Sequence, residues 1–341
     1  MDLIGERERV LAFARGSAHP DGGFGWLRGD GSLDLARGRE LWINTRMTYV
    51  FALAGERELV ESGLHALRTD FRDAEHGGWF SVAGEPSDKL AYEHVFVVLA
   101  AAAAGDEALL GEALEVLETH FWEERFGALA DVCSRDWSRV EAYRGANANM
   151  HGVEAMVATG DELWLDRARR ITERLTGGVR VIEHHDSIWR PQPHYNRGDP
   201  AHRFRPYGVT PGHGFEWARL AYGLGFQDEA RRLFSGAIHD GWDGGGFVYT
   251  VDFDGRPVVR ARLHWVLCEA IAAAAVLGER DFERAWWDLA ERHFIDREGG
   301  SWWHELDSEN RPASTIWDGK PDVYHALGAV TAGLRSPPAS P

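Results

Sequence analysis

A histidine and a glutamate stand three residues apart, directly after a stretch rich in proline and glycine. The segment is Phe204-Arg-Pro-Tyr-Gly-Val-Thr-Pro-Gly-His-Gly-Phe-Glu-Trp217, and helical spacing of apolar residues resumes at its end. His213 and Glu216 therefore fall in the first turn of a predicted helix, on one face. We expect the two side chains to hydrogen-bond each other and to take part in acid–base chemistry.

Further polar side chains recur near the starts of apolar helical segments, about one repeat apart. A guanidinium in a segment as apolar as that around Arg46 needs an anionic or hydroxyl-rich partner. Imidazoles change charge near neutral pH, which suits them to proton transfer. Buried ion pairs and core histidines are the alternative interpretation of the same residues. The candidates for one shared pocket are Arg46, Tyr92, His94, Asn149, His151, His213, Glu216, His264 and His325.

The elements that would position these residues follow from an internal repeat. A Gly-Gly or Gly-aromatic turn recurs roughly every 50 residues, and a degenerate copy at Asp186-Ser-Ile-Trp-Arg190 completes a set of six. The five clear copies are Asp21-Gly-Gly-Phe-Gly-Trp26, His76-Gly-Gly-Trp-Phe80, Arg125-Phe-Gly-Ala128, Asp243-Gly-Gly-Gly-Phe247 and Glu298-Gly-Gly-Ser-Trp302.

Each repeat holds two predicted helices, of which alternate ones differ in character. One kind carries Arg and Glu on one face, as a solvated outer layer would, and the other is apolar nearly all round. We predict an all-α fold, an (α/α)6 barrel in a single domain over 1–335, followed by a short disordered tail, 336–341. An open solenoid is the alternative. The expected helices span 2–16, 35–54, 56–72, 88–104, 106–121, 143–159, 161–177, 213–224, 226–239, 261–278, 279–293 and 321–334.

Charge and composition limit the partners. The chain has 37 Lys and Arg against 54 Asp and Glu, a net charge of −17 that repels polyanions, so we expect neither nucleic acid nor a membrane as partner. With no secretory-signal pattern and only Cys133 and Cys268, we expect a cytoplasmic protein whose cysteines are core residues. Its 15 Trp and 16 His are typical of sugar pockets, although Trp also fills helical cores.

Motifs for metals and cofactors are missing from the sequence. It contains no His-Glu-x-x-His or Cys-x-x-Cys pair, no dinucleotide or phosphate loop and no Gly-x-Ser-x-Gly elbow. His213-x-x-Glu216 alone is weak evidence for coordination. We therefore expect no cofactor and no metal ion.

With these residues identified, four segments together resemble the N-acylglucosamine 2-epimerase superfamily, closest to its aldose–ketose isomerase branch of mannose and sulfoquinovose isomerases. The resemblance runs through nearly the whole chain and implies the same (α/α)6 barrel. It also implies a monosaccharide substrate, while the oligomeric state, a monomer or a weak homo-oligomer, stays open. The segments are Asn44-Thr-Arg-Met-Thr-Tyr49, Asn149-Met-His-Gly-Val-Glu154, Phe204 to Trp217, and Gly319-Lys-Pro-Asp-Val-Tyr-His325.

The resemblance also implies roles for single residues. His325 takes the place of the histidine that moves the proton at C2 of the sugar, and His213 that of the second acid–base histidine. Arg203 competes with Arg205 for the role of pocket arginine, and Trp317 in the last long loop is a candidate to stack on the ligand. The residues expected to bind substrate are Arg46, Tyr92, His94, His151, Arg205, Glu216 and Trp317.

The implied reaction is metal-independent interconversion of D-mannose and D-fructose through a cis-enediolate, with D-lyxose and D-xylulose as a further pair. A 2-epimerase acting on N-acylglucosamine, mannose or cellobiose, or a sulfoquinovose isomerase, remains an alternative outcome of the same chemistry. Two other classes stay open. An α/α-barrel glycoside hydrolase would need two carboxylates facing across the pocket, and a non-catalytic sugar-binding toroid would need no pair of histidines.

Overall fold

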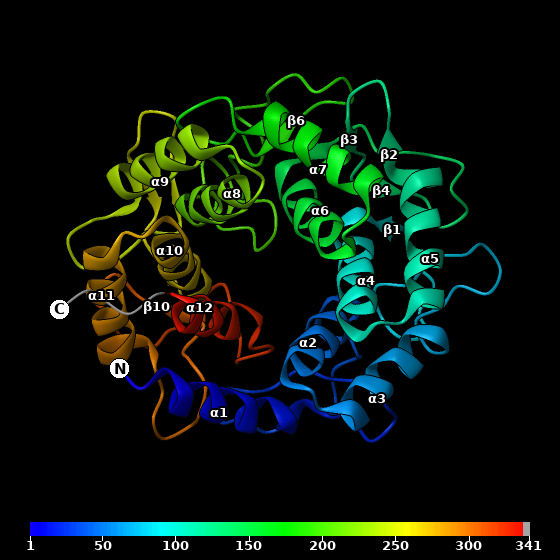
Figure 1. Ribbon diagram of the computed structural model, residues 1–341, viewed down its shortest axis with the longest axis horizontal. Helices are drawn as coiled ribbons and strands as arrows, with labels where there is room; N and C mark the ends of the chain where they lie inside the picture. The colour runs from blue at the N-terminus through cyan, green and yellow to red at the C-terminus, as the bar shows by residue number, and fades with distance from the viewer. Residues whose placement is uncertain (337–341) are drawn as a thin grey trace.

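The helices of the protein form two concentric rings (Figure 1). The computed structural model describes residues 1–336, so residues 337–341 of the expected tail lie outside the described residues. The inner ring consists of α2 (Leu41–Ala54), α4 (Ala91–Ala104), α6 (Ala146–Thr159), α8 (Pro211–Gly223), α10 (His264–Leu277) and α12 (Tyr324–Arg335). The outer ring consists of α1 (Leu3–Ala14), α3 (Arg57–Arg68), α5 (Glu107–Val116), α7 (Glu162–Leu175), α9 (Gln227–Gly241) and α11 (Arg280–Leu289).

The ring closes on itself, which distinguishes it from an open solenoid. The last inner helix, α12, packs against both α10 and α2, and α1 packs against α12 from outside. All twelve predicted helices are present within residues 1–336, and the predicted (α/α)6 barrel is confirmed. The largest error in a helix start is at α2, which begins at Leu41 and not near 35, because a turn closed by Arg37 N–H and Asp34 C=O precedes it.

Burial follows the two-ring arrangement. Inner helices are covered by outer helices on one side and by one another on the other, so α10 buries nearly every residue from Val266 to Ala275. Outer helices such as α7 bury only one stripe, which includes Trp164, Ala168 and Ile171, and leave their charged face in water. This is the predicted difference between alternate helices, and its cause is whether a helix has solvent on one side.

Short connections join the two helices of a pair. At the ends of α4 and α6 a glycine adopts the left-handed conformation, with φ of 68° at Gly105 and 66° at Gly160. The next residue starts the outer helix: the Asp106 carboxylate accepts from Leu109 N–H, and the Asp161 carboxylate accepts from backbone N–H groups of the first turn of α7. At both sites a glycine thus ends one helix and an acidic residue starts the next.

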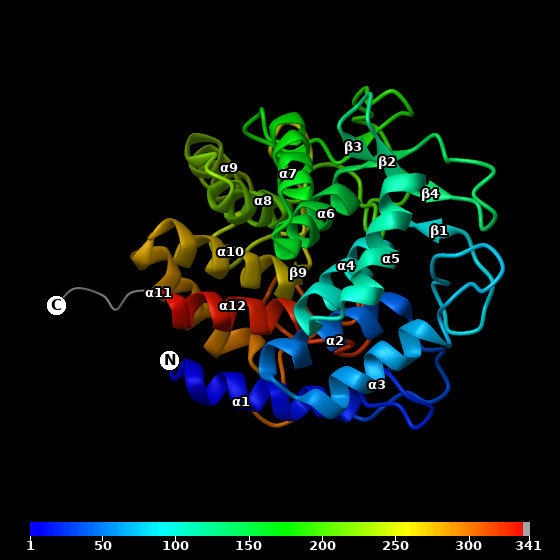
Figure 2. The same cartoon turned by 45° about the vertical axis from the view of Figure 1, so that its right-hand side comes forward.

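The longer connections lie at the opposite end and carry short antiparallel strand pairs and π-helical turns. Figure 2 shows β1 to β4 projecting on the side away from the N-terminus. The strand pairs are β1 (Lys89–Leu90) with β4 (Val132–Cys133), β2 (Trp122–Glu123) with β3 (Ala128–Leu129), β5 (Arg144–Gly145) with β6 (His184–His185), β7 (Thr250–Val251) with β8 (Pro257–Val259), and β9 (Arg262–Leu263) with β10 (Glu305–Leu306). The turns Leu117–Phe121 and Ala290–Phe294 extend α5 and α11, and a 3₁₀ turn, Arg15–Ser17, follows α1.

Inner helices hold the Gly-rich turns through polar side chains. Asn44 accepts from Phe24 N–H, Asn149 accepts from Leu129 N–H, and His94 Nε2 accepts from Trp79 N–H. A Cβ on Gly23 would lie 2.3 Å from the Asn44 oxygen, so the turn requires glycine there. Two of the recurring polar positions therefore have another role: Asn149 and His94 tie turns to helices, as Asn44 does.

Two general expectations concern the surroundings of the protein. Among the described residues, no helix combines the length and apolarity that a membrane span requires. Cys133 and Cys268 are both buried and unpaired, as predicted for small core residues.

Candidate active site

One pocket lies where the N-terminal ends of the inner helices meet, under the long connections. It brings together eight of the candidate residues and Arg203, the alternative to Arg205, and the other lining residues come from the same helices and from the loops above them. The eight candidates are Arg46, Tyr92, His151, His213, Glu216, His264, Trp317 and His325. The others are Asn147, Phe204, Pro206, Tyr249, Trp265, His304 and Asp322.

His325 lies in the first turn of α12, and a carboxylate holds its imidazole ring in place through Nδ1. Its Nδ1 lies 2.8 Å from a carboxylate oxygen of Glu269 on α10. Burial and the nearby Arg46 guanidinium keep the pKa of His325 well below its usual 6.5. The imidazole is therefore neutral at neutral pH, donates Nδ1–H to Glu269 and leaves the Nε2 lone pair free to accept a proton.

His213 forms the second histidine–carboxylate pair, and its partner differs from the predicted one. Nδ1 of His213 lies 2.9 and 3.0 Å from the two carboxylate oxygens of Glu183, in the loop before β6. Glu216 makes no bond to His213, so that part of the prediction is wrong. The reason is that α8 begins at Pro211 and directs His213 toward the β5–β6 side, whereas Glu216, one turn later, faces the barrel axis.

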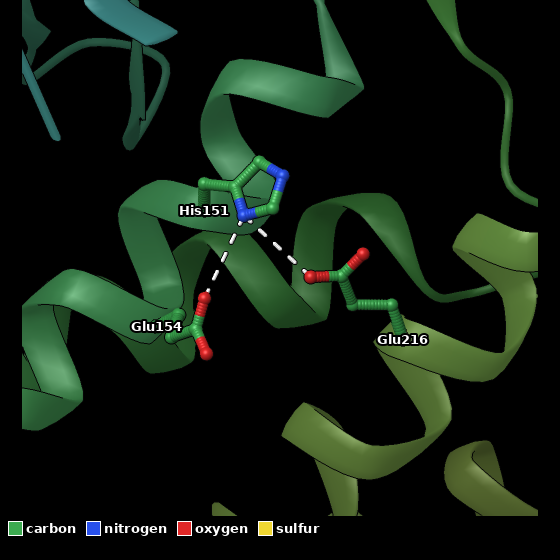
Figure 3. A group of neighbouring side chains, drawn as sticks. All are labelled: His151, Glu154 and Glu216. Atoms are coloured by element: carbon green, nitrogen blue, oxygen red, sulfur yellow. Dashed lines mark ion pairs between the residues drawn. The ribbon is translucent and has the colours of Figure 1, made fainter. Parts of the chain in front are cut away.

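Glu216 lies beside His151 instead (Figure 3). The His151 Nδ1 atom is 3.5 Å from Glu216 Oε1 and 3.6 Å from Glu154 Oε2. Within residues 1–336, neither oxygen of Glu216 nor Nδ1 of His151 makes a hydrogen bond. Burial raises the pKa of Glu216 well above 4.5 and lowers the pKa of His151 to about 4. Both groups are therefore driven toward their neutral forms.

One layer of side chains contains His151, Glu154, Glu216 and Glu269. Arg219 lies below this layer and contacts its three carboxylates. Its guanidinium is 3.1 Å from Glu269, 3.6 Å from Glu154 and 3.7 Å from Glu216. Tyr324 donates its hydroxyl hydrogen to Glu154 from the opposite side. The layer thus has more carboxylates than cations, which is consistent with the raised pKa of Glu269, caused mainly by burial and opposed by Arg219.

Two groups of side chains in this layer have donor atoms close enough to hold a metal ion: His151 with Glu154 and Glu216, and Glu216 with Glu269 and His325. The Arg219 guanidinium, however, already supplies positive charge to all three carboxylates. A metal ion here would be repelled by that guanidinium, so the donor set fits a bound cation poorly. The expectation of metal-independent chemistry stays a prediction.

Arg46 has an anionic partner and a hydroxyl partner, as expected for a guanidinium in an apolar helix. It lies 3.3 Å from an Asp322 oxygen and donates to the Tyr92 hydroxyl over 2.7 Å. Its guanidinium also lies over the rings of Phe96 and Tyr324, at 4.6 and 4.8 Å. The side chain is nearly fully buried, so its donors are fixed in place at the pocket wall.

Of the two arginines in the proline-rich loop, Arg203 and not Arg205 lines the pocket. Arg203 lies 4.6 Å from the centre of the Trp317 ring and donates to a backbone carbonyl of the same loop as Trp317. Arg205 is held elsewhere, by Asp131 at 3.0 Å and by the ring of Tyr143 at 4.0 Å. The expectation that Arg205 binds substrate is therefore corrected.

His94 is the other residue expected to bind substrate that lies outside the pocket, and the candidate Asn149 also lies outside it. Its Nδ1 bonds the Leu90 carbonyl and its Nε2 accepts from Trp79 N–H, so both ring nitrogens are used within the core. Its position in the first turn of α4 matches that of pocket residues, but it faces outward, toward the Gly-rich turn. Sequence position along the helix was right and the direction around the helix was wrong.

Sequence reasoning missed the two carboxylates that hold the histidines. Glu269 had a signal, because it stands alone in the apolar run Leu267 to Ala275, as Arg46 does in its own helix. Glu183 had none, since it lies in a loop 30 residues before His213 and only the fold brings them together. Both histidine rings also contact Trp265, with ring centres 5.1 Å from His213 and 5.8 Å from His325.

The pocket is small. Its cavity volume is about 50 Å³, space for a few water molecules. The partly exposed Arg203 and Phe204 pack against Trp317 at its upper wall.

Comparisons with known proteins identify the family of the chain. A family model described as N-acylglucosamine 2-epimerase matches residues 22–329. A D-mannose isomerase of Pseudomonas cannabina pv. alisalensis is 45% identical, over 95% of this chain and 90% of that protein. Another, from Thermobifida fusca, is 43% identical over 97% and 93%.

Solved structures show the same fold. A crystal structure of D-mannose isomerase superposes with a TM-score of 0.90 at 29% identity, covering 98% of this chain and 97% of that one. Cellobiose 2-epimerase from Spirochaeta thermophila shares the fold, with a TM-score of 0.85 at 21% identity over 98% and 95%. The family predicted from the four sequence segments is confirmed: the chain belongs to the N-acylglucosamine 2-epimerase family.

Proposed function

We propose that this protein is an aldose–ketose isomerase that interconverts D-mannose and D-fructose. The observation that carries the proposal is the pair of imidazoles, His325 and His213, that face one pocket while a glutamate holds each Nδ1. Two relatives more than 40% identical over most of the chain bear the name D-mannose isomerase, which supports the same substrate. Residues 1–335 are proposed to act as one catalytic domain.

The first step is opening of the sugar ring, which exposes the carbonyl group. His213, oriented by Glu183, is the group assigned to this step and to moving protons between O1 and O2. The open aldehyde acidifies the hydrogen on C2, which neutral His325 then removes through Nε2. The C2–H electron pair forms the C1–C2 double bond of the enediolate, and His325 becomes an imidazolium beside the Glu269 carboxylate.

The enediolate needs fixed donors for its negative charge. Arg46 is suited to this role because Asp322 and Tyr92 hold its guanidinium in one orientation before substrate arrives. Return of the proton from His325 to C1 gives the ketose. A single base on one face of the intermediate is enough for this transfer, whereas 2-epimerisation requires delivery of a proton to the opposite face of C2.

One experiment separates the candidate functions. The protein is incubated with D-mannose in deuterated water, and the products are identified by NMR. The proposal expects fructose, with proton transfer between C2 and C1. Glucose labelled at C2 would identify a 2-epimerase, and no exchange or conversion, with binding intact, would identify a sugar-binding protein. Parallel assays with D-lyxose and sulfoquinovose determine how much of the sugar the pocket recognises beyond C3.

The hydrolase alternative receives less support from the site. Glu216 and Asp322 are the carboxylates that line the pocket, but Asp322 is held in an ion pair by Arg46. Glu216 lies against His151 and beside the carboxylates of Glu154 and Glu269.

Retained activity after dialysis against a chelator is the expected result for a metal-independent enzyme. A cytoplasmic location remains part of the proposal.

A further inference from the structure

A second and larger cavity lies at the other end of the barrel, between the C-terminal halves of inner helices. Its volume is about 450 Å³. Exposed Leu53 on α2 and Val276 on α10 line it, so this rear cavity reaches the protein surface. Small residues keep it open, namely Ala272, Ala275, Gly328 and Ala332.

The rear cavity extends inward to the layer that supports the catalytic histidine. Glu269, Arg219, Glu154 and Tyr324 line it. The rear cavity and the candidate active-site pocket, called the front pocket below, have no lining residue in common. The hydrogen bond from His325 Nδ1 to Glu269 therefore crosses the wall between the two spaces.

We propose that the rear cavity is a proton port, through which solvent exchanges the Nδ1 proton of His325 by way of Glu269 while a sugar covers Nε2 at the front. This inference rests on the proposed function of His325. The exchange starts from the imidazolium, in which Nε2 also carries a proton: Nδ1–H passes to the Glu269 carboxylate, which leaves a neutral imidazole, and from Glu269 the proton passes to a water molecule in the rear cavity. The reverse transfer restores the imidazolium, so no other reactant is consumed.

Arg219 is a positioning residue for this port. It contacts one Glu269 oxygen, Oε2, at 3.1 Å, while Oε1 accepts from His325. Its guanidinium thus fixes the orientation of the carboxylate between the ring and the rear cavity. The other pair provides the contrast, because Glu183 does not line the rear cavity whereas Glu269 does. Only one of the two histidines has a rear connection.

The first test is rescue by a small acid. Glu269→Ala removes the carboxylate and leaves a space that adjoins the rear cavity, into which formate fits. We expect kcat to fall roughly 100-fold and added formate to restore it about 10-fold, saturably. Because formate enters from the rear, saturating mannose does not reduce the rescue. Glu183→Ala is the matched control, and formate does not restore it.

The second test closes the port. A Cβ added at Gly328 meets no atom within 4 Å, so Gly328→Leu projects into the cavity without displacing the wall. In the double variant Glu269→Ala/Gly328→Leu, formate rescue is lost. Rescue that mannose competes away, that Gly328→Leu leaves intact, or that is equal in Glu183→Ala would overturn the port.

A third measurement does not depend on catalysis or on Glu269→Ala folding. The exchange of the His325 Nδ1 proton with water is followed by NMR in the otherwise unaltered protein and in Gly328→Leu. The port predicts severalfold slower exchange in Gly328→Leu, and equal exchange rates contradict it. If the protein shows no activity on mannose but the exchange slows, the proposed function fails and the port stands.

Discussion

The two histidine–glutamate pairs have the same local geometry and different surroundings. In each, Nδ1 lies 2.8 to 3.0 Å from a carboxylate and the ring contacts Trp265. Glu269, however, belongs to an apolar helix, contacts Arg219 and borders the rear cavity. Glu183 belongs to a loop and, within residues 1–336, forms no ion pair with an arginine or lysine.

This difference shows that the same local pairing can stand in different electrostatic surroundings. Burial and the Arg46 guanidinium lower the pKa of His325, which favours the neutral base that removal of the C2 proton requires. The surroundings of His213 include no comparable cation at contact distance among the described residues. The proposed assignment of the C2 proton to His325 and of ring opening to His213 comes from the family resemblance, and the lowered pKa of His325 is consistent with it.

The largest expected effect is loss of the imidazoles themselves. His325→Asn should lower kcat on mannose by about 10²- to 10⁴-fold, the usual contribution of a general base. His213→Asn should retain more activity, because sugars also open spontaneously in water. Steady-state kinetics with thermal melts as a folding control measure both. A His325→Asn protein with full activity would remove the assignment.

The next effect distinguishes the two carboxylates. Glu269→Gln and Glu183→Gln keep the size of the side chain and remove the charge that stabilises an imidazolium. We expect both to reduce kcat by roughly 10- to 100-fold with little change in KM, as for other groups that orient a catalytic residue. Glu269→Gln should have the larger effect, because the His325 imidazolium that Glu269 stabilises also lies near the positive charge of Arg46. Equal losses would show that the surroundings do not matter.

The pH dependence tests the cause of the difference. Because the pKa of His325 is below 6.5, the acidic limb of kcat/KM should lie below pH 6.5. An NMR titration of Arg46→Gln should show the pKa of His325 moved upward, as removal of a nearby cation requires. The unfolded chain binds the proton at the higher pKa, so acid below pH 6.5 also favours unfolding through this residue. A His325 pKa above 6.5 contradicts the assignment.

A smaller effect, on stability, is expected at Glu216, whose carboxyl oxygens make no hydrogen bond within residues 1–336. The folded protein raises the pKa of Glu216 above 4.5, so Glu216 contributes a cost to stability that grows as the pH rises above 4.5. Glu216→Gln removes the titration and should stabilise the fold at pH 7 by roughly 1 kcal/mol, while activity falls. Urea unfolding at pH 4 and pH 7 measures this, and a gain at pH 4 alone would contradict it.

The smallest expected effect is at His94. Asn44 and Asn149 perform the same turn-holding role in neighbouring repeats. His94→Asn should therefore keep kcat and KM within about twofold, as expected for a residue away from the site. This variant is the histidine control for His325→Asn. A large loss of activity with the fold intact would return His94 to the list of substrate-binding residues.

Much of the fold followed from the sequence because the signals were local and repeated. Glycine turns, acidic helix starts and the alternation of apolar and amphipathic segments each depend on residues within a few positions of one another. Predicted helix starts were least accurate at α2, where a turn over 34–37 precedes the helix. The direction of a side chain around a helix was harder, as His94 shows.

The sequence by itself determined the two-ring barrel and the histidines at the helix starts, because periodicity, turn chemistry and residue type carry that information. The family followed from the resemblance of four segments to known sequences. Only the tertiary structure decided which partner each histidine has. Glu269 reaches His325 across 56 positions and Glu183 reaches His213 across 30. Such pairings depend on how neighbouring inner helices and loops pack, and no local pattern encodes them. The rear cavity, formed where three inner helices end, belongs to the same class.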